Sequence, residues 1–387
     1  ITIPNSVKSI GNSAFRRCTG LTSLTIGNNV TSISDNAFYD CSGLTSITIP
    51  NTVESIGTGA FQGCSGSTSV IIGNGVKSIA ANAFYGCSRL TSITIPNNVE
   101  SIGTGAFQEC SGSTSVSIGN GIHSISDNTF YDCSGLTSII IPDNVESIGN
   151  GAFSNCDNLA SINLGSNLTS VANDAFQECN ALTSVELHSD LLVSHFTTIF
   201  PTYQNIASVI IGEGVTKIQG SGDTGAFQNC QRLTSVTICE GVIQIGNRAF
   251  YQCRSLESIE NIPNTVKSIG IYAFTDTSLR SINIPDSLEL IENHAFFQLA
   301  SLTEVNFGNG VKSIGERSFS QTGLTSLTLP NSIDSIGDRA FYMCGSLKSV
   351  IIPEGITSIG EIAFDSCKQL TFVNFSGTRQ PRNSGNA

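Results

Sequence analysis

Apolar residues recur along this chain with a period of 23 residues. A phenylalanine, usually preceded by alanine, marks the period at Phe15, Phe38, Phe61, Phe84, Phe107, Phe130, Phe153 and Phe176. After a gap the pattern returns, with spacings of 22 to 24 residues, at Phe227, Phe250, Phe274, Phe296, Phe319, Phe341 and Phe364. A period of this length is typical of a solenoid, in which each repeat packs on its neighbours.

One repeat, residues 41–64, shows the local elements. Residues 46–49 (SITI) alternate polar and apolar side chains, which predicts a short strand with its isoleucines inward. Pro50 ends this strand, and residues 53–56 form a second short apolar–polar segment. Residues 57–63 carry Phe61 and predict a 3₁₀ or single helical turn. Such a coil cannot bury its own apolar face, so copies must stack.

The pattern C-x-x-L-x-x-I-x-I-P-x-x-V-x-x-I-G-x-x-A-F at residues 41–61 resembles the BspA-type (treponemal-type) leucine-rich repeat family. The likeness extends over residues 1 to 375. The resemblance implies a right-handed solenoid with a parallel sheet on one face. It also implies cell-surface proteins of bacteria and mucosal protists, several of them linked to adhesion and matrix-protein binding.

The pattern and the resemblance together predict the fold class and the domain organisation. We expect an α/β, mostly β, leucine-rich-repeat solenoid of about 16 coils, with a parallel sheet on one face and short 3₁₀ or helical turns opposite. Residues 1–375 should form a single solenoid domain, and residues 376–387, which lack an apolar pattern, a flexible tail.

Residues 187–226 interrupt the period. Leu187, Phe200 and Ile206 still fit a degenerate coil with one extra residue, and a four-residue insertion then precedes Phe227. Insertions in solenoids form loops, which are either tolerated bulges or carriers of function. A second irregularity is the replacement of the usual leucine by Ser67 and Ser113, which lie 46 residues apart.

Composition and charge exclude several classes of protein. The net charge of −12 argues against nucleic-acid binding, which needs a basic stripe, and disfavours an anionic membrane surface. No apolar run approaches the roughly 18 residues of a membrane span, so we expect no direct membrane insertion. The chain starts inside a repeat at Ile1, which we interpret as a fragment or a processed product.

Cysteine is abundant but does not form a recognisable disulfide framework. Twelve of the 13 cysteines lie three residues after the phenylalanine of their repeat, and Cys239 is the exception. An odd number excludes complete pairing within the chain. The 23-residue spacing gives no C-x-x-C pair for zinc. We therefore expect a row of small buried thiols, a slot that Leu299 fills in one repeat.

Residue patterns that could carry catalytic or ligand chemistry are sparse. Residues 220–225 match G-x-G-x-x-G, but dinucleotide binding also needs a following long helix, so we expect a flexible loop. His188, Asp190 and His195 form the only local cluster of ligand-type side chains, and a metal site would need three or four such groups to converge. We predict no enzyme activity, no catalytic residues, no cofactor and no metal site.

The outward strand positions form two columns across the predicted sheet. The candidate partner-binding face comprises the members of both columns in five successive coils: Ser46, Thr48, Ser69, Ile71, Ser92, Thr94, Ser115, Ser117, Ser138 and Ile140. Hydroxyl groups offer many hydrogen-bond donors and acceptors, and the isoleucines add isolated apolar contacts. The columns favour a broad protein- or glycan-binding face. Alternatively, the hydroxyls only keep an exposed sheet soluble, or form a lattice for ice.

These observations lead to two functional hypotheses. The first is a non-enzymatic cell-surface or secreted interaction protein, hence extracellular, that binds protein (or glycan) partners through the sheet face. Its adhesive role comes from the family resemblance. The second is a structural repeat segment that stacks end to end, because a terminal coil exposes unpaired strand edges, or that forms part of a larger surface assembly.

Overall fold

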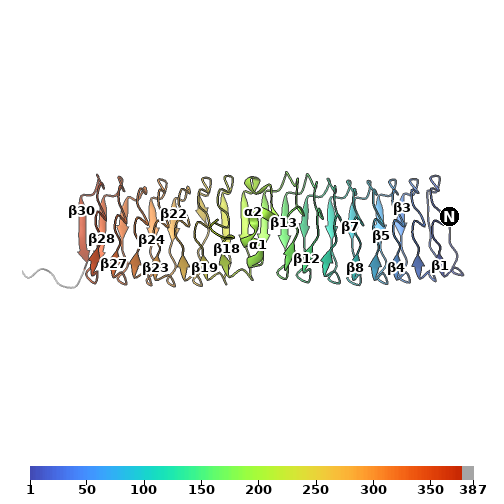
Figure 1. Ribbon diagram of the computed structural model, residues 1–387, viewed down its shortest axis with the longest axis horizontal. Coiled ribbons are helices and arrows are strands. Elements are labelled where there is room, and N and C mark those ends of the chain that lie inside the picture. The colour runs from blue at the N-terminus through green and yellow to red at the C-terminus, as the bar shows by residue number, and fades with distance from the viewer. Residues whose placement is uncertain (377–387) are drawn as a thin grey trace, which may run out of the picture. The chain divides into compact units, whose positions relative to one another are not determined.

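The computed structural model describes residues 1–376, and residues 377–387 lie outside the described part. The chain forms two compact units. The first comprises Ile1–Leu192 and Phe196–Ile206, and the second comprises Val193–His195 and the chain from Ala207 onward. Each unit is a stack of coils with parallel strands, in keeping with the predicted solenoid (Figure 1). That residues 1–375 act as a single domain stays a prediction.

Each regular coil carries two short strands, a leading strand and a trailing strand. The leading strands of the first unit are β3 (Ser46–Thr48), β5 (Ser69–Ile71), β7 (Ser92–Thr94), β9 (Ser115–Ser117), β11 (Ser138–Ile140), β13 (Ser161–Leu164) and β15 (Ser184–Leu187). Its trailing strands are β1 (Ser9–Ile10), β2 (Ser32–Ile33), β4 (Ser55–Ile56), β6 (Ser78–Ile79), β8 (Ser101–Ile102), β10 (Ser124–Ile125), β12 (Ser147–Ile148) and β14 (Ser170–Val171).

The second unit repeats this arrangement. Its leading strands are β16 (Ser208–Ile211), β18 (Ser235–Ile238), β20 (Ser258–Ile259), β22 (Ser281–Asn283), β24 (Glu304–Asn306), β26 (Ser326–Thr328), β28 (Ser349–Pro353) and β30 (Phe372–Ser376). Its trailing strands are β17 (Lys217–Ile218), β19 (Gln244–Ile245), β21 (Ser268–Ile269), β23 (Leu290–Ile291), β25 (Ser313–Ile314), β27 (Ser335–Ile336) and β29 (Ser358–Ile359).

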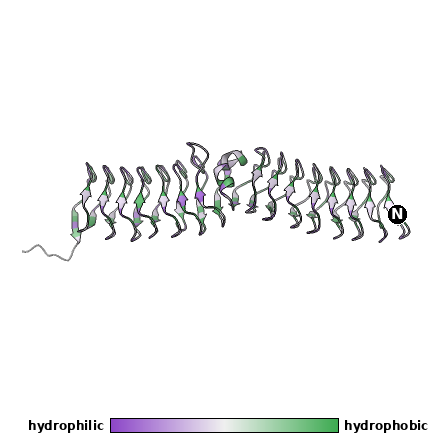
Figure 2. Cartoon of the chain, turned by 60° about the horizontal axis from the view of Figure 1, so that its bottom comes forward, coloured by the Kyte–Doolittle hydropathy of each residue, from purple (hydrophilic) through white to green (hydrophobic). Residues whose placement is uncertain are grey.

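Strand pairing follows the 23-residue period directly. Ser46 is the parallel partner of Ser69, and Ser9 is the partner of Ser32, so each residue pairs with its equivalent one coil later. Along a leading strand the middle residue is buried and its neighbours are exposed, as in β3, where Ile47 points inward. Hydrophobic residues therefore recur at the same place from coil to coil (Figure 2).

Stacked phenylalanines form the centre of both units. In the first unit successive ring centroids lie between 5.2 and 5.7 Å apart, and in the second unit between 5.0 and 5.5 Å. The Phe61 and Phe84 rings are inclined by only 4°, and both are completely buried. These spacings fall in the range of offset stacking, which adds about 0.5–1.5 kcal/mol per pair to the area term. The coils predicted from the phenylalanine period therefore stack, and their rings form an aromatic spine in each unit.

The segment that carries each phenylalanine is a series of tight turns, not the 3₁₀ or helical turn expected from the sequence. Gly59 and Gly63 have φ of 59° and 73°, and left-handed residues at these two places interrupt any helix. The amides of Gly59, Phe61 and Gly63 instead donate to carbonyls of the next coil, at 2.7 to 2.9 Å. The turns thus form a third hydrogen-bonded ladder beside the two strand ladders.

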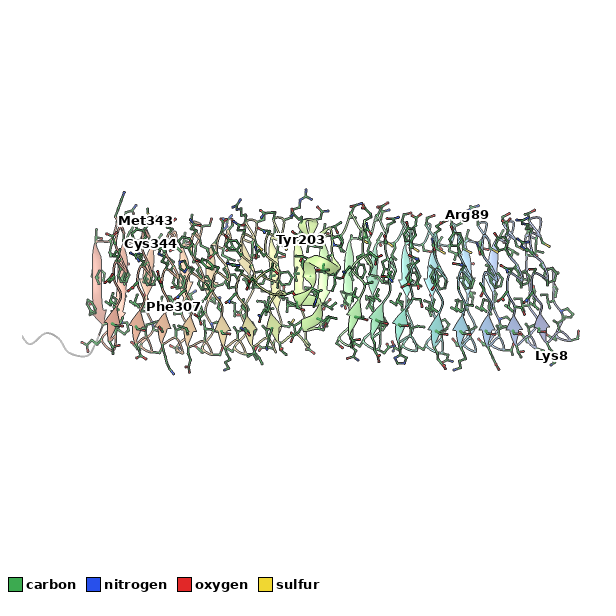
Figure 3. The ribbon with its side chains drawn as sticks, viewed as in Figure 1. Lys8, Arg89, Tyr203, Phe307, Met343 and Cys344 are labelled. Carbon is green, nitrogen blue, oxygen red and sulfur yellow. The ribbon has the colours of Figure 1, made fainter. Side chains whose placement is uncertain are left out.

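All thirteen cysteines are free thiols, and most of them are buried. Most thiols of the row hydrogen-bond to the coil before them, as when the Cys87 Sγ donates to the Phe61 carbonyl at 3.3 Å. In the second unit Met343 is exposed on the turn while the adjacent Cys344 is buried (Figure 3). The predicted buried row is confirmed for ten of its twelve members; Cys18 is exposed and Cys367 is half-buried, and Cys239, outside the row, is also half-buried.

The irregular coil contains the helices of the described chain: α1 (Asp190–Ser194), α2 (Phe196–Ile199) and the 3₁₀ helix η1 (Tyr203–Asn205). They occupy the place where a regular coil has its trailing strand and turn. The Phe200 ring lies 5.4 Å from Phe176 and takes the phenylalanine position one residue late, which confirms the threading predicted from the sequence. The helices themselves were not predicted.

The predicted tail begins one residue too early. Ser376 is the last residue of β30, where it pairs with Pro353 of β28. The rest of the tail, residues 377–387, falls outside the described residues.

Removing one ring from the spine should be costly. We expect Phe84→Ala to lower the free energy of unfolding by about 3–5 kcal/mol, because it leaves a cavity between two stacked rings. Urea unfolding followed by circular dichroism measures this loss. The control is Phe372→Ala, whose side chain is 54% exposed and which should change stability by less than about 1 kcal/mol. Equal losses for the two variants would contradict the stacked core.

The buried thiols should make the fold sensitive to alkali. Burial raises the pKa of Cys87, Cys133 and Cys179 from an ordinary 9.0 to about 12. The unfolded chain loses these protons above pH 9 while the folded chain keeps them, so the free energy of unfolding should fall between about pH 9 and 12. Urea titrations at pH 8 and 10.5 measure the fall. A variant with alanine at all three positions should show a smaller fall, and an unchanged slope would refute the explanation.

Candidate binding face

The structure places all ten candidate residues on one exposed face of the first unit, formed by β3, β5, β7, β9 and β11. Each flanks an inward residue of its strand, and each is exposed. The ladders align the columns: Thr48 is the partner of Ile71, and Thr94 is the partner of Ser117. We call these ten residues the sheet face. It contains no ionisable side chain.

Two isoleucines interrupt the hydroxyl surface. Ile71 is 60% exposed and Ile140 is 67% exposed, although both side chains are large and apolar. The other outward residue of each strand is a serine, Ser69 or Ser138, so neither isoleucine belongs to a continuous apolar patch. Isolated exposed isoleucines are common on protein surfaces. Here they matter because a groove opens beside Ile140.

A groove of about 730 Å³ opens beside Ile140 on the sheet face. Ser115, Ser117 and Ser138 form its floor and sides, and the loop at Asp143 borders it. Ser117 is smaller than Thr94 and Ile140 on the neighbouring coils, so the column is hollow at this point. Strand pairing is also reduced here, because Ser115 and Ser138 are the single residue pair between β9 and β11.

The serines that replace leucine at positions 67 and 113 lie in the two coils of the sheet face where strand pairing is irregular. Both side chains are completely buried and donate to the backbone of the preceding coil, Ser113 to Leu90 at 3.0 Å. A serine fills less of the core than a leucine. The inward valines of the strands that follow, Val70 and Val116, are 9% exposed, whereas Ile93 is 1% exposed. The ladder ends after β5 and is weakened after β9, directly beyond these two coils.

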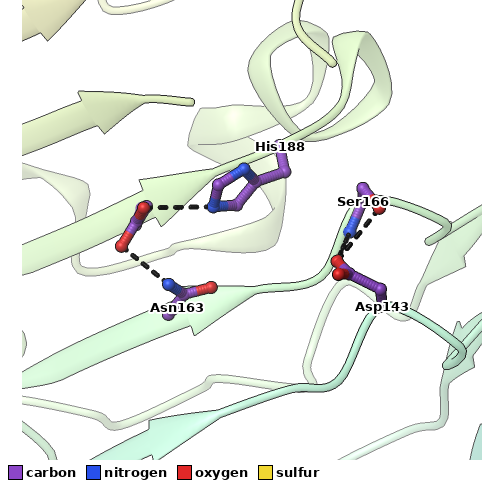
Figure 4. A network of polar contacts seen from close by, with 5 residues as sticks. Asp143, Asn163, Ser166 and His188 are labelled. Atoms are coloured by element: carbon purple, nitrogen blue, oxygen red, sulfur yellow. Dashed lines mark hydrogen bonds and ion pairs between the residues drawn. The ribbon is translucent and has the colours of Figure 1, made fainter. Parts of the chain in front are cut away.

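Beyond Ile140 the second column changes from hydroxyl and apolar residues to amide and acid. Asn163 donates to a Glu186 oxygen at 2.7 Å, and the other Glu186 oxygen lies 3.1 Å from the His188 Nε2 (Figure 4). Nearby, the Asp143 carboxylate accepts two hydrogen bonds from Ser166, one from its backbone amide at 2.9 Å and one from its hydroxyl at 3.0 Å. These bonds, with a smaller contribution from His188, lower the pKa of Asp143.

These ionisable side chains therefore lie beyond one end of the sheet face, and the ten residues of the face itself are neutral. In the sequence, Asn163 and Glu186 follow Ile140 in the second column at the same 23-residue spacing. Sequence reasoning missed the groove and the hydrogen bonds between side chains. The smaller Ser117 and the buried Ser113 were the available signals.

The repeat pattern matches a family model over most of the chain. A model of the BspA type leucine rich repeat region, in six copies, matches residues 1–114, 100–222, 197–299, 221–333 and 267–381. The chain belongs to the BspA-type leucine-rich-repeat family. Members of this repeat family are typically non-enzymatic.

Solved leucine-rich-repeat structures resemble this BspA-type chain. A leucine-rich repeat protein from Bacteroides ovatus is 28% identical, with 96% of this chain and 86% of the other covered and a TM-score of 0.42. A leucine rich cell surface protein from Faecalibacterium prausnitzii is 26% identical over 96% and 84%, with a TM-score of 0.41. The leucine-rich repeat protein of T. pallidum is 25% identical over 49% and 83%, with a TM-score of 0.35. No curated protein matches the chain.

The other sequence candidates occupy separate places in the BspA-type fold. Asp190 begins α1, His188 contacts Glu186, and His195 lies 2.9 Å from the Ser194 hydroxyl. Within residues 1–376, no three His, Cys, Asp or Glu side chains are grouped so as to hold a metal ion. The same residues include no helix with the length and apolar character of a membrane span.

Proposed function

We propose that this BspA-type chain is a non-enzymatic interaction protein, at the cell surface or secreted, that binds a partner protein through the sheet face. The observation that carries the proposal is the sheet face itself: ten exposed residues without a charge, with a groove beside an isoleucine that is 67% exposed. The extracellular location and the adhesive role rest on the family resemblance.

A protein partner suits this surface better than a glycan does. The neutral hydroxyls can be covered at a small desolvation cost, since no ion must leave water. Ile140 and Ile71 offer apolar anchors, and the groove gives a partner side chain a place to insert beside Ile140. The carboxylate of Glu186, beyond one end of the sheet face, would orient the partner by its charge.

The alternative structural hypothesis, end-to-end stacking on further copies or coils, stays a prediction. Stacking would use terminal coils and leave the sheet face free, so the two hypotheses concern different surfaces.

Lysine substitutions on the sheet face should weaken binding. The intact chain serves as bait for partners from the surrounding surface and secreted proteins, and biolayer interferometry then measures the affinity of a captured partner. We expect the double variant Thr48→Lys, Thr94→Lys to lose at least about tenfold in affinity, because two flexible cations must be desolvated or excluded from the contact.

The matched control is Thr58→Lys, Thr104→Lys. These threonines belong to the same two repeats as Thr48 and Thr94, are also exposed, and lie on the turns. The control adds the same charge to the same coils and should bind the partner as the unmodified chain does. Equal affinities for the two double variants would remove the sheet face as the binding site.

A further inference from the structure

The four-residue insertion of the second unit encloses a cavity of about 380 Å³. Its walls come from the insertion, at Asp223 and Thr224, and from the next two coils, at Asn247, Arg248 and Tyr272. This volume is at the small end of the range for ligand pockets, about 300–1,000 Å³. The cavity lies on the turn side of the coils and shares no residue with the sheet face.

Hydrogen bonds hold the inserted turn in place. The Thr224 hydroxyl donates to the Ser221 carbonyl at 2.7 Å, and the Arg248 Nη1 donates to the Asp223 carbonyl at 3.1 Å. A Cβ added to Gly225 would lie 1.7 Å from the Arg248 carbonyl oxygen, so the loop backbone packs directly on the next coil. These contacts hold the wall of the cavity in place and leave the Asp223 carboxylate exposed.

Arg248 and Tyr272 stand at a backbone position where the first unit uses small residues. Their φ values are 55° and 57°, and the equivalent residues of the first unit are mostly glycine and asparagine, such as Gly59 and Asn82. The left-handed conformation costs a side chain of ordinary size about 1–2 kcal/mol. The second unit nevertheless places large residues at this position in successive coils, among them His294, Arg317 and Arg339, and at the insertion two of them, Arg248 and Tyr272, line the cavity.

Contacts with neighbouring aromatic rings hold Tyr272 in place on this turn surface. The His294 ring lies 4.7 Å from the Tyr272 ring, and the Tyr251 ring meets Tyr272 edge-on at 6.4 Å. Phe297 in turn packs edge-on against His294 at 5.5 Å. Burial lowers the pKa of His294, which favours the neutral form of its ring.

The cavity therefore joins a fixed aromatic ring to a set of polar groups whose formal charges cancel, Arg248 against Asp223. The guanidinium and the Asn247 amide supply donors, while the Asp223 carboxylate is an acceptor. A charged ligand would face one repulsive group in either case. A hydroxyl-rich neutral ligand can use both kinds of group, and the C–H face of a sugar ring packs on an aromatic ring.

We propose that this cavity binds a neutral saccharide of one or two sugar units, with a sugar ring on Tyr272 and its hydroxyls hydrogen-bonded to Asp223 and Arg248. This site is independent of the proposed protein contact on the sheet face. It would give the chain a second ligand class, bound on the turns of the second unit.

The test applies the intact chain to an array of neutral oligosaccharides ending in glucose, galactose, mannose or N-acetylated hexosamines, together with carboxylated and sulfated counterparts. Isothermal titration with the best-bound neutral oligosaccharide then compares variants. We expect Tyr272→Ala and Asp223→Ala each to lower the affinity at least tenfold. Tyr342→Ala, which removes a tyrosine from a turn outside the cavity, and Thr48→Lys, Thr94→Lys should leave it within twofold.

Several results would overturn the proposal: no neutral oligosaccharide bound, binding of charged glycans alone, or unchanged affinity in both cavity variants. Loss of binding in the sheet-face variant but not in the cavity variants would also move the saccharide away from this cavity. Circular dichroism and the melting temperature check that each variant folds. If Tyr272→Ala does not fold, Asp223→Ala decides, since Arg248 donates to the backbone oxygen of residue 223 and that bond survives the substitution.

Discussion

Ring-on-ring stacking between consecutive coils is the constraint on which the structure depends. Each phenylalanine meets its equivalent one coil away at about 5 Å, which holds equivalent residues of successive coils in register even where a coil has 22 or 24 residues. Once that register is set, equivalent residues form columns. The hydroxyls of the sheet face, the buried thiols and the left-handed turn residues are all consequences of one repeated distance.

The inward and outward positions carry different restrictions. Inward residues are confined by the ring stack and by backbone ladders on the strands and the turns, so a serine at position 113 disturbs the neighbouring strands. Outward residues are free to change, and the two units use this freedom differently. The first unit offers a flat neutral sheet with a groove at Ser117, and the second offers a turn cavity with Tyr272 and Arg248 in its wall. A solenoid can thus carry separate ligand sites without altering its core.

The sequence revealed most of the fold because its information is repeated. The Phe spacing, the alternation at residues 46–49 and the cysteine column each recur in many coils, and Phe200 could be placed in the irregular coil from the same pattern. Features that occur once were not predicted. The helices at residues 190–199 lack a repeating signal. The left-handed turn residues do recur, but glycine shares their position with asparagine and larger residues, so the sequence did not reveal the turn ladder. The groove on the sheet face and the cavity at the insertion depend on the sizes of side chains on adjacent coils, which the sequence of one repeat does not show.

The central claim is that each coil is bonded to the next along its turns as well as its strands, with the phenylalanine ring held between them. Amide hydrogen exchange followed by mass spectrometry tests this directly, by comparing peptides that cover residues 57–63 with peptides that cover the leading strand β7. The account predicts that the turn amides, including that of Phe61, exchange as slowly as the strand amides, because they donate to the next coil. Exchange of the turn at the rate of an open loop, beside protected strands, would contradict it.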